Sequence, residues 1–137
     1  MQRVLADSGF VVAFINSADQ LHSDVRPVYF RYPQILLPRL TLVEVVYLVT
    51  RDAGIHIAVA FLKSLPRSRF KLINSTDRDM ERAADIMHRY SDSKVDFVDA
   101  SIMAIAERLS IQTILTIDQR DFRLFRPLHC QSFTLLP

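Results

Sequence analysis

The sequence is poor in residues that define several common protein classes. Its 137 residues include one cysteine, two glycines and no tryptophan. The lone Cys130 excludes an internal disulfide framework and favours a reducing compartment. So few glycines, with 50% of the residues apolar, exclude a low-complexity or disordered chain. Because this length is typical of one domain with one substantial core, we expect a single domain over residues 1–137.

Long hydrophobic segments are also missing. No apolar run approaches the ~20 residues that are needed to span a bilayer. The first residues reach an acid at Asp7 and lack the apolar stretch and cleavage site of a signal peptide. We therefore expect a cytoplasmic protein with no membrane partner.

Charge of either sign is not in large excess. The formal net charge is +2 and the pI is about 8.9, which is too weak to indicate a polyanionic partner by itself. Basic residues nevertheless gather around residues 67–71 and 120–126, where they could attract phosphates and bind them in a salt-sensitive way. The alternative is that both groups are ordinary solvated faces. The candidates for phosphate contact are Arg67, Arg69, Arg120 and Arg123.

Short apolar strands alternate with helical segments along the chain. The pattern predicts strands at residues 3–6, 34–37, 70–73, 113–117 and 131–135. It predicts helices at residues 9–15, 19–32, 41–51, 57–65, 77–90 and 97–109. This alternation indicates an α/β fold with a mostly parallel sheet that is covered on both faces.

Four acidic residues are embedded in apolar sequence: Asp7, Glu44, Asp99 and Asp118. A carboxylate among core residues is costly to desolvate unless a cation or a hydrogen bond compensates. No matching set of embedded lysines or arginines exists, so a divalent cation is the natural source of positive charge. Asp7 and Asp118 directly follow predicted strands and are expected to meet at one edge of the sheet, with the other two acids delivered from early helical turns.

Such a group of carboxylates predicts a particular chemistry. Oxygen ligands suit Mg²⁺ or Mn²⁺, which also hold waters and phosphate oxygens. The metal can activate water and neutralise charge on a phosphate, while a carboxylate outside its coordination shell orients the water or accepts its proton.

Each acid also has a purely structural interpretation. Asp7 could cap the following helix, and Glu44 could be the capping-box partner of Thr41. Asp99 could be favoured by the helix dipole alone, and Asp118 could initiate a turn. The histidines show no ligand spacing among themselves or with Cys130 and are interpreted as surface or packing residues.

Four short motifs, in this order and spacing, resemble the PIN-domain ribonucleases. The similarity is greatest to the VapC-type toxins of bacterial toxin–antitoxin modules, and it covers nearly the whole chain. The motifs are Leu5-Ala6-Asp7-Ser8, Leu42-Val43-Glu44-Val45, Phe97-Val98-Asp99-Ala100 and Leu115-Thr116-Ile117-Asp118. Any one of them is weak alone, and the combination carries the resemblance.

The resemblance implies a three-layer α/β/α sandwich with about five strands and metal-dependent endonucleolytic cleavage of RNA. It makes Asp7 and Asp99 direct Mg²⁺ or Mn²⁺ ligands and Asp118 a ligand either directly or through water. Glu44 would bind a second metal or position the attacking water, and Ser8 would support the site by hydrogen bonding.

The same resemblance implies partners. A cognate antitoxin would block the acidic groove, a homodimer would form, and the four arginines named above would contact RNA. Asp96 and Asp121 are assigned to the surroundings of the acidic pocket, although Asp96 could simply cap its helix.

Two other functions fit parts of the pattern. A catalytically silent PIN-like scaffold could hold RNA or a protein, but it would not require all four acids. A phosphoacceptor receiver domain would need an acidic pair after the first strand, where Asp7 is instead followed by Ser8 and Gly9.

Overall fold

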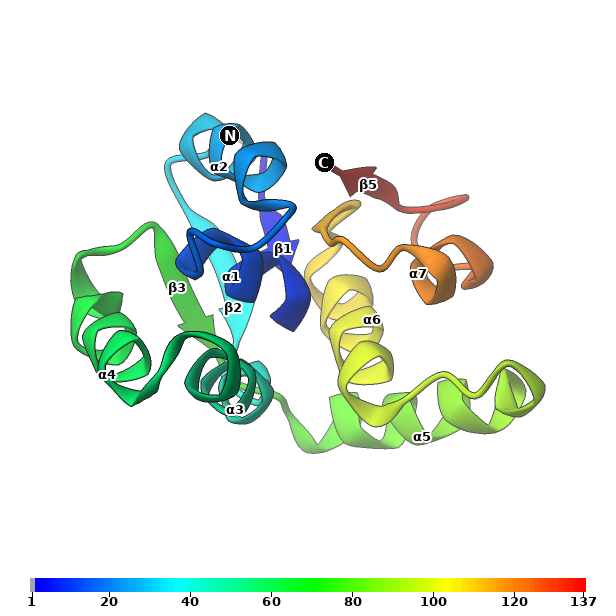
Figure 1. The fold of residues 1–137 in the computed structure, drawn as a ribbon. Coiled ribbons are helices and arrows are strands. Elements are labelled where there is room, and N and C mark those ends of the chain that lie inside the picture. The colour runs from blue at the N-terminus through cyan, green and yellow to red at the C-terminus, as the bar shows by residue number, and fades with distance from the viewer. Residues whose placement is uncertain (1) are drawn as a thin grey trace.

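Five short strands form one parallel sheet at the centre of the protein (Figure 1). This computed structural model describes residues 2–137. The strands are β1 (Val4–Ala6), β2 (Ile35–Pro38), β3 (Phe70–Ile73), β4 (Thr113–Leu115) and β5 (Thr134–Leu136). Their order is β3-β2-β1-β4-β5, and every neighbouring pair is parallel. The expected α/β class and strand number are confirmed.

Helices connect the strands and cover the sheet. They are α1 (Ser8–Ile15), α2 (His22–Arg31), α3 (Thr41–Ala53), α4 (Ile55–Ser64), α5 (Asp77–Arg89), α6 (Phe97–Leu109) and α7 (Arg120–Leu124). Two short 3₁₀ helices, η1 (Leu65–Arg67) and η2 (Ser91–Ser93), follow α4 and α5. None of the helices in residues 2–137 is both long and apolar enough to cross a bilayer.

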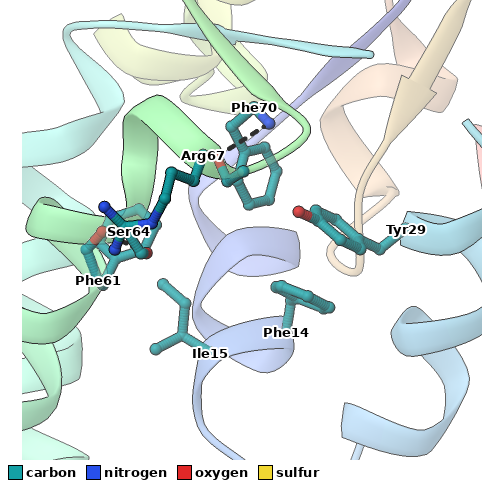
Figure 2. Close-up of a pocket in the computed structure, with 8 residues that line it drawn as sticks. Phe14, Ile15, Tyr29, Phe61, Ser64, Arg67 and Phe70 are labelled. Atoms are coloured by element: carbon teal, nitrogen blue, oxygen red, sulfur yellow. Dashed lines mark hydrogen bonds between the residues drawn. The ribbon is translucent and has the colours of Figure 1, made fainter. Parts of the chain in front are cut away.

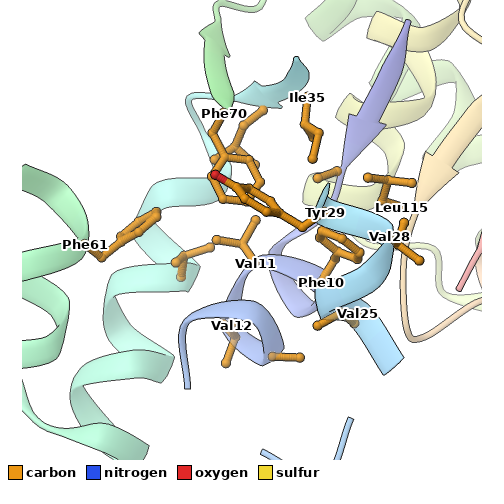
Figure 3. Packing of buried hydrophobic residues seen from close by; sticks show 14 of the residues in the cluster. Phe10, Val11, Val12, Val25, Val28, Tyr29, Ile35, Phe61, Phe70 and Leu115 are labelled. Carbon is orange, nitrogen blue, oxygen red and sulfur yellow. The ribbon is translucent and has the colours of Figure 1, made fainter. Parts of the chain in front are cut away.

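The strands divide their side chains between two apolar clusters, because successive residues of a strand point to opposite faces. In β1, Val4 and Ala6 join one cluster while Leu5 joins the other. The first cluster packs the sheet against α1 to α4 (Figure 3). The second packs it against α5, α6 and α7. The result is the expected α/β/α sandwich.

Capping and ion pairing fix α5 against α6. Thr76 and Asp79 form a reciprocal capping box at the start of α5. The buried Asp79 carboxylate also pairs with Arg108 of α6 at 3.0 Å. Because α6 carries Asp99 in its first turn, this contact helps to set the position of that acid.

Several local predictions differ from the structure, among them the strand predicted at residues 113–117, because β4 ends at Leu115. The chain forms α7 where no helix was predicted, because five residues are too few for a helical period to show. Helix α2 begins at His22, later than the predicted Asp19, and it accommodates Pro27. Strand β5 begins at Thr134, beyond the predicted start at Gln131, because this edge strand has little buried pattern to mark it.

Candidate active site

Seven residues line a small hollow of about 160 Å³ at the carboxyl ends of the central strands. They are Asp7, Ser8, Gly9, Glu44, Asp96, Asp99 and Asp118. The structure therefore brings together all four acids that the sequence singled out, with Asp96 as a fifth. No basic side chain lines this hollow in the part of the chain that is described. It is a concentration of negative charge without an internal counterion.

Asp7 is the most firmly held of these acids. It lies between β1 and α1, and the residue is only 6% exposed. One carboxylate oxygen, Oδ1, accepts the backbone N–H of Phe10 at 3.0 Å, so Asp7 does cap α1. The other, Oδ2, accepts the hydroxyl of Thr116. Burial raises the pKa of Asp7 to about 6 despite these hydrogen bonds, and the charges of Glu44 and Asp118 add to the rise.

Asp99 faces the same hollow from the first turn of α6. Its backbone N–H donates to Asp96 Oδ1 at 2.8 Å, which makes Asp96 the N-cap of that helix. Burial raises the pKa of Asp99 to about 8, and the neighbouring charges of Asp96, Asp7, Asp121 and Asp118 contribute in that order. The acids of this hollow therefore resist ionising together unless a cation neutralises them.

Glu44 is not the capping partner that its spacing from Thr41 suggested. The Thr41 hydroxyl donates to the carbonyl of Pro38 at 2.7 Å, and no side-chain hydrogen bond caps α3 at Leu40. The capping-box interpretation is wrong because Thr41 is already the first helical residue and its buried side chain turns back toward β2. The exposed Glu44 side chain lines the hollow and makes no hydrogen bond within the described residues 2–137.

Ser8, Asp118 and Asp121 differ in their positions relative to the hollow. Ser8 lines the hollow, and its buried hydroxyl has no hydrogen-bond partner among the described residues. Asp118 follows β4, and its carboxylate accepts the N–H of Arg120 at 3.5 Å, consistent with a turn. Asp121 does not line the hollow, although its charge reaches Asp99.

The carboxylates lie close together, but their oxygens are not arranged to coordinate a single metal ion. Within residues 2–137, no three histidine, cysteine, aspartate or glutamate side chains are placed to hold one ion as they stand. Glu44 and Asp118 are exposed, whereas Asp7 is fixed at both oxygens. Metal binding would therefore require side-chain rotation of the exposed acids toward Asp7, which is possible for exposed rotamers.

Thr116 is the residue that sequence reasoning missed. It lies one residue beyond β4 and is fully buried, and its hydroxyl contacts the Asp7 carboxylate. The available signal was a hydroxyl residue at the end of an apolar strand, two positions before an acid. Nothing in the sequence alone pairs that hydroxyl with Asp7, because the contact depends on the adjacency of β1 and β4.

The first pair of candidate arginines lies away from the acidic hollow. Arg67 lines a separate hollow of about 380 Å³ with Phe14, Tyr29 and other aromatic residues (Figure 2). The Arg69 guanidinium lies 5.1 Å from the centre of the Phe30 ring and donates to the Phe30 carbonyl at 2.9 Å. Arg69 thus has a structural role in joining β3 to the end of α2.

The second pair lies on α7, closer to Asp118 in the chain. Arg120 donates to the carbonyl of Ser93 at 2.7 Å, and Arg123 donates to the side chain of Gln119 at 2.7 Å. Both guanidinium groups are exposed, so they remain available to a phosphate.

Comparison with known proteins identifies the family of this chain. The PIN domain family model matches residues 4–126. The chain is 27% identical to Ribonuclease VapC26 of Mycobacterium tuberculosis over 135 residues, covering 98% of this chain and 100% of that protein. The expected likeness to VapC-type PIN domains is therefore confirmed.

Solved structures share the fold. The crystal structure of VapC20 from Mycobacterium tuberculosis, described as a sarcin-ricin loop cleaving toxin, superposes with a TM-score of 0.77 at 23% identity, over 85% of this chain and 90% of that one. A toxin–antitoxin complex from Klebsiella pneumoniae gives a TM-score of 0.65 at 19% identity, over 87% and 89% of the two chains.

Proposed function

Because the chain belongs to the PIN domain family, we propose that it is a metal-dependent endoribonuclease that acts as the toxin of a toxin–antitoxin module. The observation that carries this proposal is the convergence of Asp7, Glu44, Asp99 and Asp118 on one hollow without a basic side chain. A scaffold that merely held RNA would gain nothing from such a concentration of negative charge, since it repels phosphates.

The residues present suit Mg²⁺ or Mn²⁺. All the side-chain donors are oxygens, as these hard cations prefer. The buried Ser8 hydroxyl lacks a partner, which fits a group that hydrogen-bonds a metal-bound water. Asp7 and Asp99 would hold the metal directly, Asp118 directly or through water, and Glu44 would bind a second metal or position the attacking water.

The metal, when bound, supplies a water of lowered pKa and positive charge beside the phosphate. The protein contributes the rest. Asp7 is immobilised by its two hydrogen bonds, and Asp99 is carried by a capped helix end. Glu44, which is exposed and lines the hollow, would bind a second metal or orient the attacking water and accept its proton.

Partners follow from the same proposal. RNA is the substrate, and exposed arginines such as Arg120 and Arg123 attract its backbone. A cognate antitoxin is the expected protein partner, which is supported by the structural neighbour that is a toxin–antitoxin complex; we propose that it covers the acidic groove. We also propose that the protein forms a homodimer and works in the cytoplasm as a single PIN-like domain over residues 1–137.

The test is cleavage of total cellular RNA by the purified protein with Mg²⁺ or Mn²⁺, with and without EDTA. Asp99→Asn, checked for folding, is run beside it to exclude a contaminating nuclease. Discrete products that need the metal and disappear in the variant are expected. Metal-loaded, antitoxin-free protein that binds this RNA but leaves it intact would instead indicate a catalytically silent scaffold.

A further inference from the structure

A second small hollow, of about 170 Å³, lies between the second half of α5 and the segment that follows α7. This arginine hollow is lined by the polar side chains of Arg82, Arg89, Tyr90 and Arg126, with Ile86 and Phe125 among its apolar residues. No acidic side chain lines it in the part of the chain that is described. Its charge is therefore opposite to that of the acidic hollow.

Many of the hydrogen-bond donors in the arginine hollow are not used by the protein itself. Among residues 2–137, the exposed Arg89 side chain forms neither a hydrogen bond nor a salt bridge. Arg126 uses only Nη1, which donates to two backbone carbonyls. Arg82 uses Nε and Nη2 in a paired contact with Glu107 and retains Nη1. The Tyr90 hydroxyl accepts a backbone N–H at 3.1 Å, so its own proton can be donated to another acceptor.

The surroundings of the arginine hollow leave a surplus of positive charge. Glu107 offsets one of the three guanidinium groups, at 2.6 Å from Arg82. Asp85 also acts on Arg82, but it does not line the hollow. Phe125 is buried and packs edge-on against Tyr90, with the ring centres 5.6 Å apart. An anion held beside this apolar surface is partly shielded from water, which strengthens its hydrogen bonds to guanidinium groups.

Two chain segments connect the arginine hollow to the acidic hollow (Figure 1). Residues 90–96 begin at the arginine hollow and end at the acidic one, and residues 118–126 run the opposite way. The two segments are joined midway, where Arg120 donates to the carbonyl of Ser93 at 2.7 Å. Residues 90–96 span at most about 20 Å even when fully extended. One RNA strand can therefore contact both hollows.

We propose that the arginine hollow binds one phosphate group of the RNA backbone, a few nucleotides from the bond that is cut. This inference rests on the proposed function. Guanidinium groups suit a phosphate because their planar N–H donors match its oxygens in paired hydrogen bonds. A phosphate contact carries no sequence information, so the hollow adds affinity and fixes the position of the strand. Free phosphate has the same chemistry, and the experiment separates the two sources.

The variant that tests the site combines Arg89→Ala with Arg126→Ala, since both side chains are exposed. Arg31→Ala is the matched control, because Arg31 is exposed in the last turn of α2 as Arg89 is in the last turn of α5. The helix dipole therefore acts alike on the two arginines. Arg89→Glu keeps the backbone contacts of Arg126 and replaces the double variant if that variant does not fold.

The first readout is the affinity for a fluorescent single-stranded RNA, measured by anisotropy in EDTA over a range of salt concentrations. The double variant is expected to bind about 10-fold more weakly than wild type, as for the loss of a charged hydrogen bond. The salt slope of log K should fall by about 0.7, the value for one phosphate of a single strand. Arg31→Ala should match wild type, and every variant should keep the wild-type Mn²⁺ affinity in calorimetry.

Two further readouts complete the experiment. In cleavage assays with Mg²⁺, the KM of the double variant for RNA should rise by a similar factor. Inorganic phosphate, added at constant ionic strength, should weaken RNA binding by wild type more than RNA binding by the double variant. This difference is expected because free phosphate competes for the arginine hollow only where the hollow is intact.

The outcomes distinguish this inference from the proposed function. Unchanged RNA affinity and KM in the double variant, or an equal loss in Arg31→Ala, would overturn the inference in a wild type that still cleaves RNA. A slope change of about 1.4 would also overturn it, by indicating two separate phosphate contacts. Phosphate binding that is lost in the variant without a change in RNA affinity would assign the hollow to free phosphate instead. A wild type that neither binds nor cleaves RNA would refute the proposed function.

Discussion

Replacing Asp99 by asparagine should make the metal-free protein more stable while it removes the activity. The structure places this carboxyl where burial and four neighbouring acids raise its pKa from 3.8 to about 8. At pH 7 the folded protein must therefore keep the group protonated, whereas the unfolded chain ionises it freely. Asparagine has a similar shape and avoids that cost.

The size of the effect follows from the pKa difference. Between 3.8 and pH 7 lie about three units, or ~4 kcal/mol at ~1.4 kcal/mol per unit. Asp99 is partly exposed, and solvent screens part of the repulsion, so about 2 kcal/mol is a realistic gain. For a chain of this size, that corresponds to an increase in Tm of about 5–10 °C.

The raised pKa of Asp99 also predicts how the stability difference between wild type and Asp99→Asn changes with pH. Between pH 4 and pH 8 the folded state of wild type binds more protons at Asp99 than the unfolded state does, so stability should fall as pH rises through this interval. Asp99→Asn should lack that part of the slope. Its advantage in Tm should therefore be largest near pH 8 and should vanish near pH 4.

Thermal unfolding in EDTA across this pH range is the assay, with Asp92→Asn as a control at an exposed acid outside the hollow. Added Mn²⁺ should then stabilise wild type and leave Asp99→Asn nearly unchanged, because ligand binding stabilises only a competent folded state. A variant no more stable than wild type at pH 8, or one with an advantage independent of pH, would refute the reasoning from burial and repulsion.

Three further changes test other parts of the structure. Glu44→Gln should abolish RNA cleavage with a change in unfolding free energy within about 0.5 kcal/mol, since its carboxylate caps nothing; a loss of helix stability in circular dichroism melts would contradict this. Asp79→Ala should cost about 1–3 kcal/mol in urea unfolding, because it removes the carboxylate partner of Arg108, which keeps only its bond to the Asn74 carbonyl, and the Asp79 half of the capping box. Arg123→Ala should weaken RNA binding and lower the salt slope of log K by about 0.7 in titrations from low to high salt, whereas an unchanged slope would remove Arg123 from the RNA interface.

The sheet and its layers could be predicted because each strand carries a strong local signal. Ile35 and Leu37 face one cluster and Leu36 the other, so β2 reads as an apolar run that is buried on both sides. Asp7 and Asp118 could be placed at one edge for a related reason, since Asp7 directly follows β1 and Asp118 lies three residues beyond the end of β4 in a parallel sheet. For these residues, the apolar pattern of each strand predicts the same burial that the folded sheet shows.

The details that escaped prediction depend on contacts between distant segments. The capping box at Thr41 had the right spacing, but the buried carbonyl of Pro38 competes for the hydroxyl. Thr116 was not identified as a site residue, because its contact with Asp7 exists only once β1 and β4 are neighbours. The spacing of two residues in the sequence shows neither the hydrogen bond from Thr41 to Pro38 nor the contact between Thr116 and Asp7.

The order of the strands also bears on when the site can exist during synthesis. The acids lie at positions 7, 44, 99 and 118. Thr116, which contacts Asp7 and lies two residues before Asp118, donates its backbone N–H to the carbonyl of Leu136 in β5. A ribosome that has released only the first hundred residues therefore exposes a chain with β1, β2 and β3 but neither β4 nor β5. The acidic hollow therefore cannot form on those first hundred residues and assembles only after β4 and the segment that carries Asp118 have emerged.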